Sequence, residues 1–158
     1  MLTMNDPRAD IKGILDEELE SLRQRIIENH IRAGQKASGK TISSLRVYVN
    51  DNQGTLFGRQ AFGVLETGRK PGKVPKGFYQ TIQQWVKDKG IQVENPKSFA
   101  YLVARKIARE GTELHRQGGR ADIYSPEIEK TIQEIMNRAF AVFKDDVTHI
   151  NLNSNEDA

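Results

Sequence analysis

The chain lacks most of the residues from which catalytic sites are built. Its 158 residues contain no cysteine and only three histidines, His30, His115 and His149, which fall in separate segments. The absence of cysteine excludes disulfides, thiolate metal sites and cysteine nucleophiles, and it fits a reducing compartment. None of the three has a second histidine at ligand spacing on one helix face, and His149, which follows Asp145 and Asp146, lies in the predicted tail. The sequence therefore predicts no catalytic residues, no metal site and no cofactor, and we expect a protein that is not an enzyme.

Apolar residues are also scarce. They make up 37% of the chain, which is below the usual globular share. No run approaches the roughly 20 apolar residues needed to span a bilayer, and the first ten residues, MLTMNDPRAD, contain no apolar signal core. We expect one domain with a modest core over residues 1–148, a flexible polar tail over 149–158, and no membrane contact. A chain that buries little surface by itself often depends on partners.

Positive charge is unevenly distributed. The net charge is only +3, yet residues 36–89 hold ten Lys or Arg against three Asp or Glu, a local charge of 10 − 3 = +7. Such asymmetry is typical of a face for nucleic acid or for an acidic partner. A solvated basic face is the alternative explanation.

The order of predicted elements is that of an α+β protein: an N-terminal amphipathic helix, a small antiparallel sheet and three C-terminal helices. Asp6-Pro7 opens the first helix, whose apolar spacing continues to about Asn29. Alternation predicts a strand over 45–49, a turn over 50–54, and one or two further strands over 55–65 with a bulge or kink at Gly58 or Gly63. The C-terminal helices are expected over 78–90, from Asn95-Pro96 to Gly111, and from Ser125-Pro126 to about residue 148. The last has the apolar residues Ile128, Ile132, Ile135, Met136, Ala139 and Phe143 at helical spacing.

A Gly/Pro-rich basic loop at Gly68–Gly77 is the strongest functional candidate. Its four cations are Arg69, Lys70, Lys73 and Lys76. Cations of this kind bind phosphates through counterion release without reading base sequence. We predict that this loop contacts either a polyanion or a neighbouring subunit.

The segment from Gly34 to Thr41, GQKASGKT, matches the phosphate-loop pattern GxxxxGK[ST] letter for letter. A true phosphate loop follows a buried strand and opens a helix. Here an amphipathic helix precedes the segment and a predicted strand follows it, and no apolar run ending in Asp supplies a second Mg²⁺ ligand. The context favours a mobile polar loop over a nucleotide-hydrolysing enzyme.

Aromatic residues allow a second functional hypothesis. The rings of Phe57, Phe62, Phe78 and Tyr79 alternate with Arg59 and the basic loop, a pattern that suits single-stranded nucleic acid. The simpler interpretation is that these rings pack the sheet against the helices. Trp85 lies on the apolar face of its helix, and we predict that it belongs to the core.

Three short motifs occur in this order: SGKTISSL at residues 38–45, AFGVLETG at 61–68 and YSPEI at 124–128. Together they resemble motifs of the head–tail joining and tail-completion proteins of tailed bacteriophages. Residues 38–45, SGKTISSL, stand where that family has a Thr-Gly-x-Leu-x-x-Ser-like loop entering a strand. Residues 61–68, AFGVLETG, look like its Glu-x-Gly turn, and residues 124–128, YSPEI, stand where its last helix begins. The resemblance covers about residues 6–145. The chain departs from the family in its additional helix pair, Phe78–Gly111, and in lacking an aromatic residue after Pro126.

The resemblance implies a non-enzymatic structural subunit of the virion neck or tail, assembled in the host cytoplasm. Copies would form a homo-oligomeric ring around the DNA channel, between portal or adaptor proteins and tail proteins, with non-specific contact to genomic DNA. A small basic nucleic-acid-binding module remains the alternative. A phosphate-loop NTPase is the third hypothesis.

Overall fold

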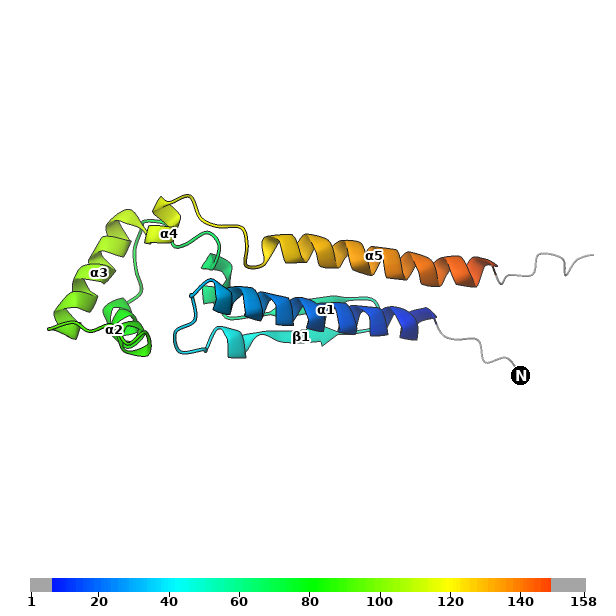
Figure 1. Cartoon of the computed structure of the whole chain (residues 1–158), viewed down its shortest axis with the longest axis horizontal. Coiled ribbons are helices and arrows are strands. Elements are labelled where there is room, and N and C mark those ends of the chain that lie inside the picture. The colour runs from blue at the N-terminus through cyan, green and yellow to red at the C-terminus, as the bar shows by residue number, and fades with distance from the viewer. Residues whose placement is uncertain (1–6, 149–158) are drawn as a thin grey trace, which may run out of the picture. The chain divides into compact units, whose positions relative to one another are not determined.

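A computed structural model describes residues 7–148 of the chain. The predicted start at Asp6 and the predicted tail over 149–158 lie outside these residues. The fold is α+β, with helices before and after a two-stranded antiparallel sheet (Figure 1). The described chain clusters into two compact units, one comprising 7–25, 46–57 and 126–148 and the other 26–45 and 58–125. No helix within 7–148 is long and apolar enough to cross a bilayer.

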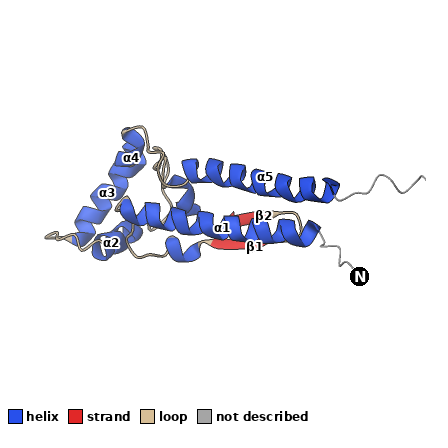
Figure 2. Cartoon of the chain, turned by 45° about the vertical axis from the view of Figure 1, so that its right-hand side comes forward, coloured by secondary structure: helices blue, strands red, loops and turns tan. Residues whose placement is uncertain are grey.

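The first unit combines two long helices with a hairpin. Helix α1 covers Pro7–Arg32 and α5 covers Ser125–Thr148, while β1 (Arg46–Val49) pairs with β2 (Gly54–Phe57). The hairpin and α5 both run alongside α1 (Figures 1 and 2). Arg138 of α5 forms ion pairs with Glu17 (2.6 Å) and Glu18 (2.7 Å) of α1, and Arg25 further along α1 pairs with Glu127 (2.8 Å) near the start of α5, so the two helices are antiparallel.

The hairpin contacts α1 closely at Gly54. A Cβ atom at this position would lie 2.3 Å from Cδ1 of Leu19, which is buried in the core. The register pairs Val49 with Gly54 and Val47 with Leu56. Val47 and Val49 are half-buried while Tyr48 is exposed, so the predicted alternation of this strand is confirmed.

One predicted element is wrong. Residues 60–64 were expected to extend the sheet, but they form a 3-10 helix, Gln60–Val64, and β2 ends at Phe57. A Cβ atom on Gly58 would lie 2.9 Å from Cδ2 of the buried Leu45, so the chain passes too close to this side chain for an ordinary residue. The backbone N–H of Phe62 then donates to the carbonyl of Arg59, a local bond that replaces strand pairing.

The second unit contains a helix pair with its own core. Helix α2 covers Phe78–Asp88 and α3 covers Pro96–Glu110. Its buried core consists of Ile82, Val86, Ala100 and Ala104. Asn95 caps α3 by accepting a hydrogen bond from the backbone N–H of Ser98 (3.0 Å), as Asn at an N-cap does. A four-residue helix that the pattern did not predict, α4 (Glu113–Arg116), follows α3.

The apolar residues of α5 divide between two faces. Ile135 and Ala139 are half-buried on the side of α1, whereas Ile128, Ile132, Met136 and Phe143 are exposed. The expected stripe is therefore only partly a core stripe.

Candidate functional site

The basic loop is held against the end of α3 by backbone hydrogen bonds. The N–H of Arg69 donates to Oγ1 of Thr112 (2.9 Å), and the N–H of Thr112 donates to the carbonyl of Arg69 (2.9 Å). Further along the loop, the N–H of Gly72 donates to the carbonyl of Ala108 (2.8 Å). Gly68, which precedes Arg69, has a φ of 67°, and a Cβ atom there would lie 2.5 Å from the backbone nitrogen of His115. Glycine is therefore required at this point, and the loop has a defined path.

The four predicted site residues divide into two groups. Lys70, Lys73 and Lys76 are exposed, as a surface that binds a polyanion or a partner requires. Arg69 is half-buried: its guanidinium lies 5.5 Å from the ring centroid of Phe78, and Nη2 donates to the carbonyl of Lys73 (2.8 Å). This cation–π contact and hydrogen bond give Arg69 a structural role that its three neighbours do not share.

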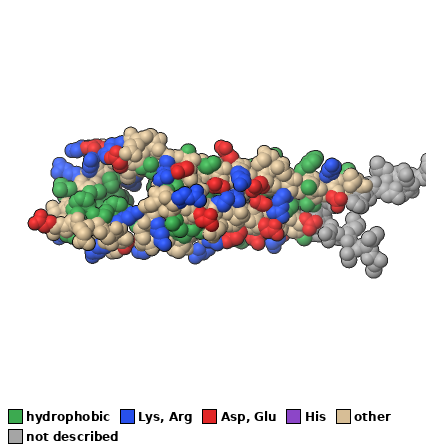
Figure 3. All heavy atoms as spheres, in the orientation of Figure 1, with side chains coloured by type: hydrophobic (Ala, Val, Ile, Leu, Met, Phe, Trp, Pro, Cys, Tyr) green, Lys and Arg blue, Asp and Glu red, His purple; other side chains and the backbone are tan. Residues whose placement is uncertain are grey.

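Next to Arg69, a pocket of about 920 Å³ opens in the second unit. Its apolar lining comes from α2 and α3, through Phe78, Ile82, Trp85, Val103 and Ile107. Four cations also line it: Arg59, Arg69, Lys106 and Arg116. Figure 3 shows hydrophobic side chains gathered over α2 and α3 with basic side chains beside them. This combination suits a ligand that is both apolar and acidic.

Trp85 is a second correction to the sequence-based prediction. The side chain is 40% exposed and lines the pocket, while Ile82 and Val86 occupy the buried positions of α2. The aromatic set is also dispersed. Phe57 is exposed on β2, and Phe62 packs on Tyr124 with ring centroids 5.1 Å apart.

Sequence reasoning missed the other cations of the pocket because they are distant in the chain. Arg59 precedes the 3-10 helix, Lys106 lies on α3, and Arg116 ends α4. One local signal existed on α3, where Lys106 lies three residues after Val103, one turn along the helix. Arg116 is paired with Glu110 (3.0 Å) and Glu113, so Arg59 and Lys106 are the more accessible charges.

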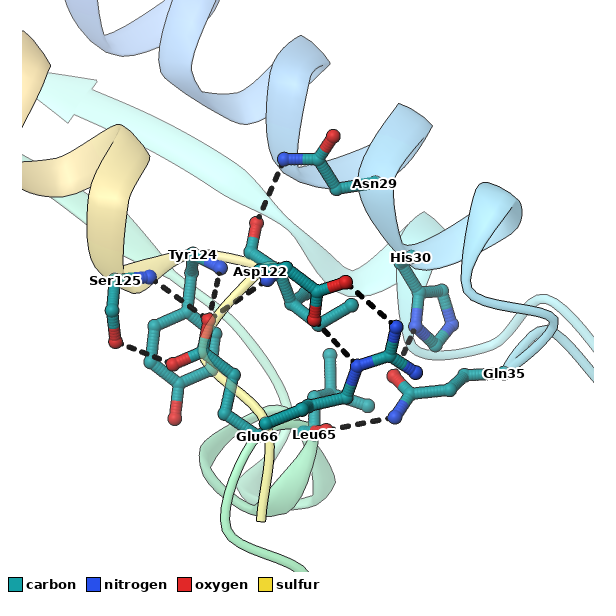
Figure 4. Close-up of polar contacts among 10 residues, drawn as sticks. Asn29, His30, Gln35, Leu65, Glu66, Asp122, Tyr124 and Ser125 are labelled. Carbon is teal, nitrogen blue, oxygen red and sulfur yellow. Dashed lines mark hydrogen bonds and ion pairs between the residues drawn. The ribbon is translucent and has the colours of Figure 1, made fainter.

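A second polar arrangement centres on Glu66, which is only 3% exposed. Its Oε1 accepts hydrogen bonds from the backbone N–H groups of Ile123 (2.9 Å), Tyr124 (2.6 Å) and Ser125 (3.0 Å), and its Oε2 accepts one from the Ser125 hydroxyl. Figure 4 shows these bonds converging on one carboxylate. Three amides at the start of α5 therefore share one buried acceptor, which stabilises the helix N-terminus.

Burial raises the pKa of Glu66, but the hydrogen bonds from Ser125, Tyr124 and Ile123 outweigh it, so that the pKa lies below its ordinary value. Burial also raises the pKa of the Tyr124 hydroxyl, with a contribution from the charge on Glu66. Glu66 is therefore ionised in neutral solution. The bonds from Ile123, Tyr124 and Ser125 give Glu66 a structural role at the start of α5.

The segment Gly34–Thr41, which matches the phosphate-loop pattern, lies after a helix and before a strand, as expected from the sequence. Helix α1 precedes it, and a 3-10 helix of three residues, Ile42–Ser44, leads into β1. Lys40 and Thr41 line a pocket of about 560 Å³ together with His30 and Asp88. Within residues 7–148, no group of three or more His, Asp or Glu side chains is placed to hold a metal ion.

Comparisons of the chain with protein-family models, with curated proteins and with solved structures found no match.

Proposed function

We propose that this protein is a non-enzymatic structural subunit of a bacteriophage neck or tail-completion ring that surrounds the DNA channel. The observation that carries the proposal is an uncovered apolar face on α5, called the α5 stripe from here on. Its members are Ile128, Ile132, Met136, Phe140, Phe143 and Val147. These residues follow one another at intervals of three or four, so they lie along one side of the helix.

The α5 stripe is too extensive to be ordinary surface. All six side chains are exposed, and Phe140 is 70% exposed. Single exposed apolar residues are normal, but a contiguous set marks an interaction site. The opposite side of α5 is already occupied by α1, through the ion pairs of Arg138 and of Arg25 with Glu127 (2.8 Å). A subunit of an assembly would bury the stripe against a neighbour.

The contacts of Glu66 support the proposal in a second way. Two of the segments that resemble phage neck proteins, 61–68 and 124–128, are distant in the chain. The bonds from Tyr124 and Ser125 to Glu66 connect the two segments. The Glu-x-Gly segment thus fixes the start of the helix that carries the stripe, which gives the two motifs a common physical purpose.

The exposed lysines of the basic loop fit the same role. Lys70, Lys73 and Lys76 project from a loop whose backbone is fixed. In a ring, many copies of such a loop would present weak phosphate contacts together, and avidity would multiply them. The alternative, a nucleic-acid-binding module that acts as a monomer, uses the same lysines but gives the α5 stripe no purpose.

Imaging of particles that contain the chain tests the proposal. Electron cryomicroscopy is expected to show a closed ring of copies between head and tail. Changing Phe140 and Phe143 to Glu is expected to yield heads and tails that do not join. The matched control changes Gln133 and Asn137 to Glu, and it should leave joining intact because these residues are exposed on the same helix outside the α5 stripe. A lone subunit inside particles, or tight DNA binding by the monomer at physiological salt, would contradict the ring.

A further inference from the structure

We propose that the α5 stripe of one copy inserts into the cationic apolar pocket of the second unit on the next copy. The inference rests on the proposed function, since it identifies which two surfaces of neighbouring ring subunits meet. It assigns an occupant to the pocket and a partner to the stripe in one step. The residues that carry it are Phe140 and Phe143 on one copy and Trp85, Arg59 and Lys106 on the other.

The stripe offers two aromatic anchors in its C-terminal half. Phe140 is 70% and Phe143 is 54% exposed, and they lie three residues apart on neighbouring turns of α5. Met136 and Val147 continue the stripe on either side. Large rigid side chains that enter pockets dominate the binding energy of most interfaces. Phe140 and Phe143 are therefore the side chains that we place in the pocket.

The pocket has the size and lining for such anchors. Its volume of about 920 Å³ lies within the range of sites that enclose ligands, and Trp85 presents a partly exposed ring inside it. From Ile128 to Val147 the stripe is about 28 Å long at 1.5 Å per residue. The pocket therefore receives one segment of the stripe, and we assign the Phe140–Val147 segment.

The charge of this end of α5 complements that of the pocket. The last turns of α5 contain one lysine, Lys144, and two carboxylates, Asp145 and Asp146, a net charge of 1 − 2 = −1, and the sequence after the helix adds Glu156 and Asp157. The pocket has four cations against one carboxylate, Glu113, a net charge of +3. The C-terminal end of a helix also has a negative partial charge. An apolar helix end followed by acidic residues thus complements an apolar pocket surrounded by cations.

The contact joins two different surfaces, so it is heterologous. Heterologous contacts generate a ring when the rotation between copies closes. A contact between two α5 stripes would be isologous instead, and it would stop at a dimer. It would also leave the pocket and its cations without a partner.

Two complementary variants test the inference. The first removes the anchors, Phe140→Ser with Phe143→Ser, and keeps the pocket. The second reverses two exposed cations of the pocket, Arg59→Glu with Lys106→Glu, and keeps the stripe. All four side chains are exposed, so both variants should fold, which circular dichroism and thermal denaturation would verify. We expect neither variant to associate alone, and an equimolar mixture to form a 1:1 dimer in sedimentation velocity at the highest soluble concentration.

Trp85 is the only tryptophan of the chain, and it reports occupancy of the pocket directly. Adding Trp85→Phe to the second variant leaves the single tryptophan in the pocket that is to be filled. Its emission is expected to shift to shorter wavelength on mixing. High salt should weaken the shift, because the complementary charges of the helix end and the pocket are then screened.

The absence of cysteine allows a covalent form of the test. Phe143→Cys in one chain and Lys106→Cys in another, oxidised together with copper phenanthroline, should form a mixed disulfide dimer. Phe143→Cys with Asp51→Cys, an exposed residue of the hairpin turn, should not.

Dimerisation of the second variant by itself would identify a stripe-to-stripe contact and overturn the inference. So would a mixture that neither associates nor cross-links. If imaging nevertheless shows a ring, only this interface is wrong; if the variants pair but the chain is absent from the neck, the proposed function fails instead.

Discussion

Glu66 and Ser125 lie 59 residues apart in the chain, yet two hydrogen bonds join them. The Ser125 backbone N–H donates to Oε1 of Glu66 (3.0 Å), and the Ser125 hydroxyl donates to Oε2. A carboxylate from the middle of the chain thus caps the last helix in place of a local residue. The stability of α5 depends on a residue outside the helix.

Replacing Glu66 should destabilise the protein because several donors lose their shared acceptor. Glu66→Ala leaves three amides and a hydroxyl without their acceptor, and we expect a loss of about 3 kcal/mol in the free energy of unfolding. Glu66→Gln keeps one acceptor but loses the charge at the helix N-terminus, so a loss of about 1 kcal/mol is expected. Urea denaturation measures both. The exposed Glu129 of the same helix provides the control, and an equal effect of Glu129→Gln would argue against the cap.

The lowered pKa of Glu66 also predicts sensitivity to acid. The unfolded chain binds a proton near the ordinary Glu value of 4.5, while folded Glu66 binds it only at lower pH. The stabilisation from Glu66 is complete above its pKa in the unfolded chain and is lost as the pH falls through its pKa in the folded chain.

His30 should also make the protein less stable as the pH falls, but at higher pH than Glu66. Its side chain is 4% exposed, and this burial lowers the pKa of His30 below 6.5. The hydrogen bond to Gln35 raises the pKa, but burial and the charge of Lys89 together outweigh it.

The unfolded chain therefore binds a proton at His30 before the folded chain does, and stability should fall as the pH drops below about 6.5. We expect a slope of up to about 1.4 kcal/mol per pH unit from this one group. His30→Gln should flatten that part of the profile, measured as the free energy of unfolding between pH 8 and pH 5.5. An unchanged slope in this variant would contradict the assignment.

Two glycines should respond in opposite directions to the same substitution. Gly54→Ala places a Cβ atom 2.3 Å from Leu19, so overpacking should cost about 1–3 kcal/mol. Gly13 lies inside α1, where a Cβ atom meets nothing within 4 Å. Gly13→Ala should therefore stabilise the protein by about 0.5–1 kcal/mol. Melting temperatures of the two variants, measured side by side, check both directions; a neutral Gly54→Ala would show that the hairpin does not pack tightly on α1.

The basic loop should separate into binding and structural residues. Changing Lys70, Lys73 and Lys76 together to Ser should leave the melting temperature nearly unchanged, because these side chains are exposed. Arg69→Ser should cost about 1–2 kcal/mol, since it removes the cation–π interaction with Phe78 and the hydrogen bond to the Lys73 carbonyl. If the lysines bind DNA, the triple variant should also reduce the salt dependence of binding, by about 0.9 in log–log slope for each phosphate that is no longer neutralised. Fluorescence anisotropy against salt measures this slope, and an unaltered slope would assign the lysines to protein contacts.

Local patterns predicted most of the elements but few of the contacts that define the site. The start of α3 was predictable because Asn95 and Pro96 adjoin each other and the cap is made within four residues. The 3-10 helix of residues 60–64 was not, because the sequence does not show how closely the chain packs on Leu45 at Gly58, where the sheet ends. Packing between elements that are distant in the chain also explains why the exposure of Trp85 and of the α5 stripe was not predictable. Helical spacing shows that side chains share a face, but only the packing of other elements decides whether that face is covered.

The position of α2 and α3 within the chain has a consequence for folding. Both helices lie between Glu66 and Ser125, so they occupy the loop that the capping contact must close. A helix pair with its own core can form from residues close in sequence, and such local contacts form early. Once formed, it brings the ends of the segment nearer and lowers the entropy that closure costs. We therefore expect the α2–α3 pair to favour closure of the contact between Glu66 and Ser125, and with it the formation of α5.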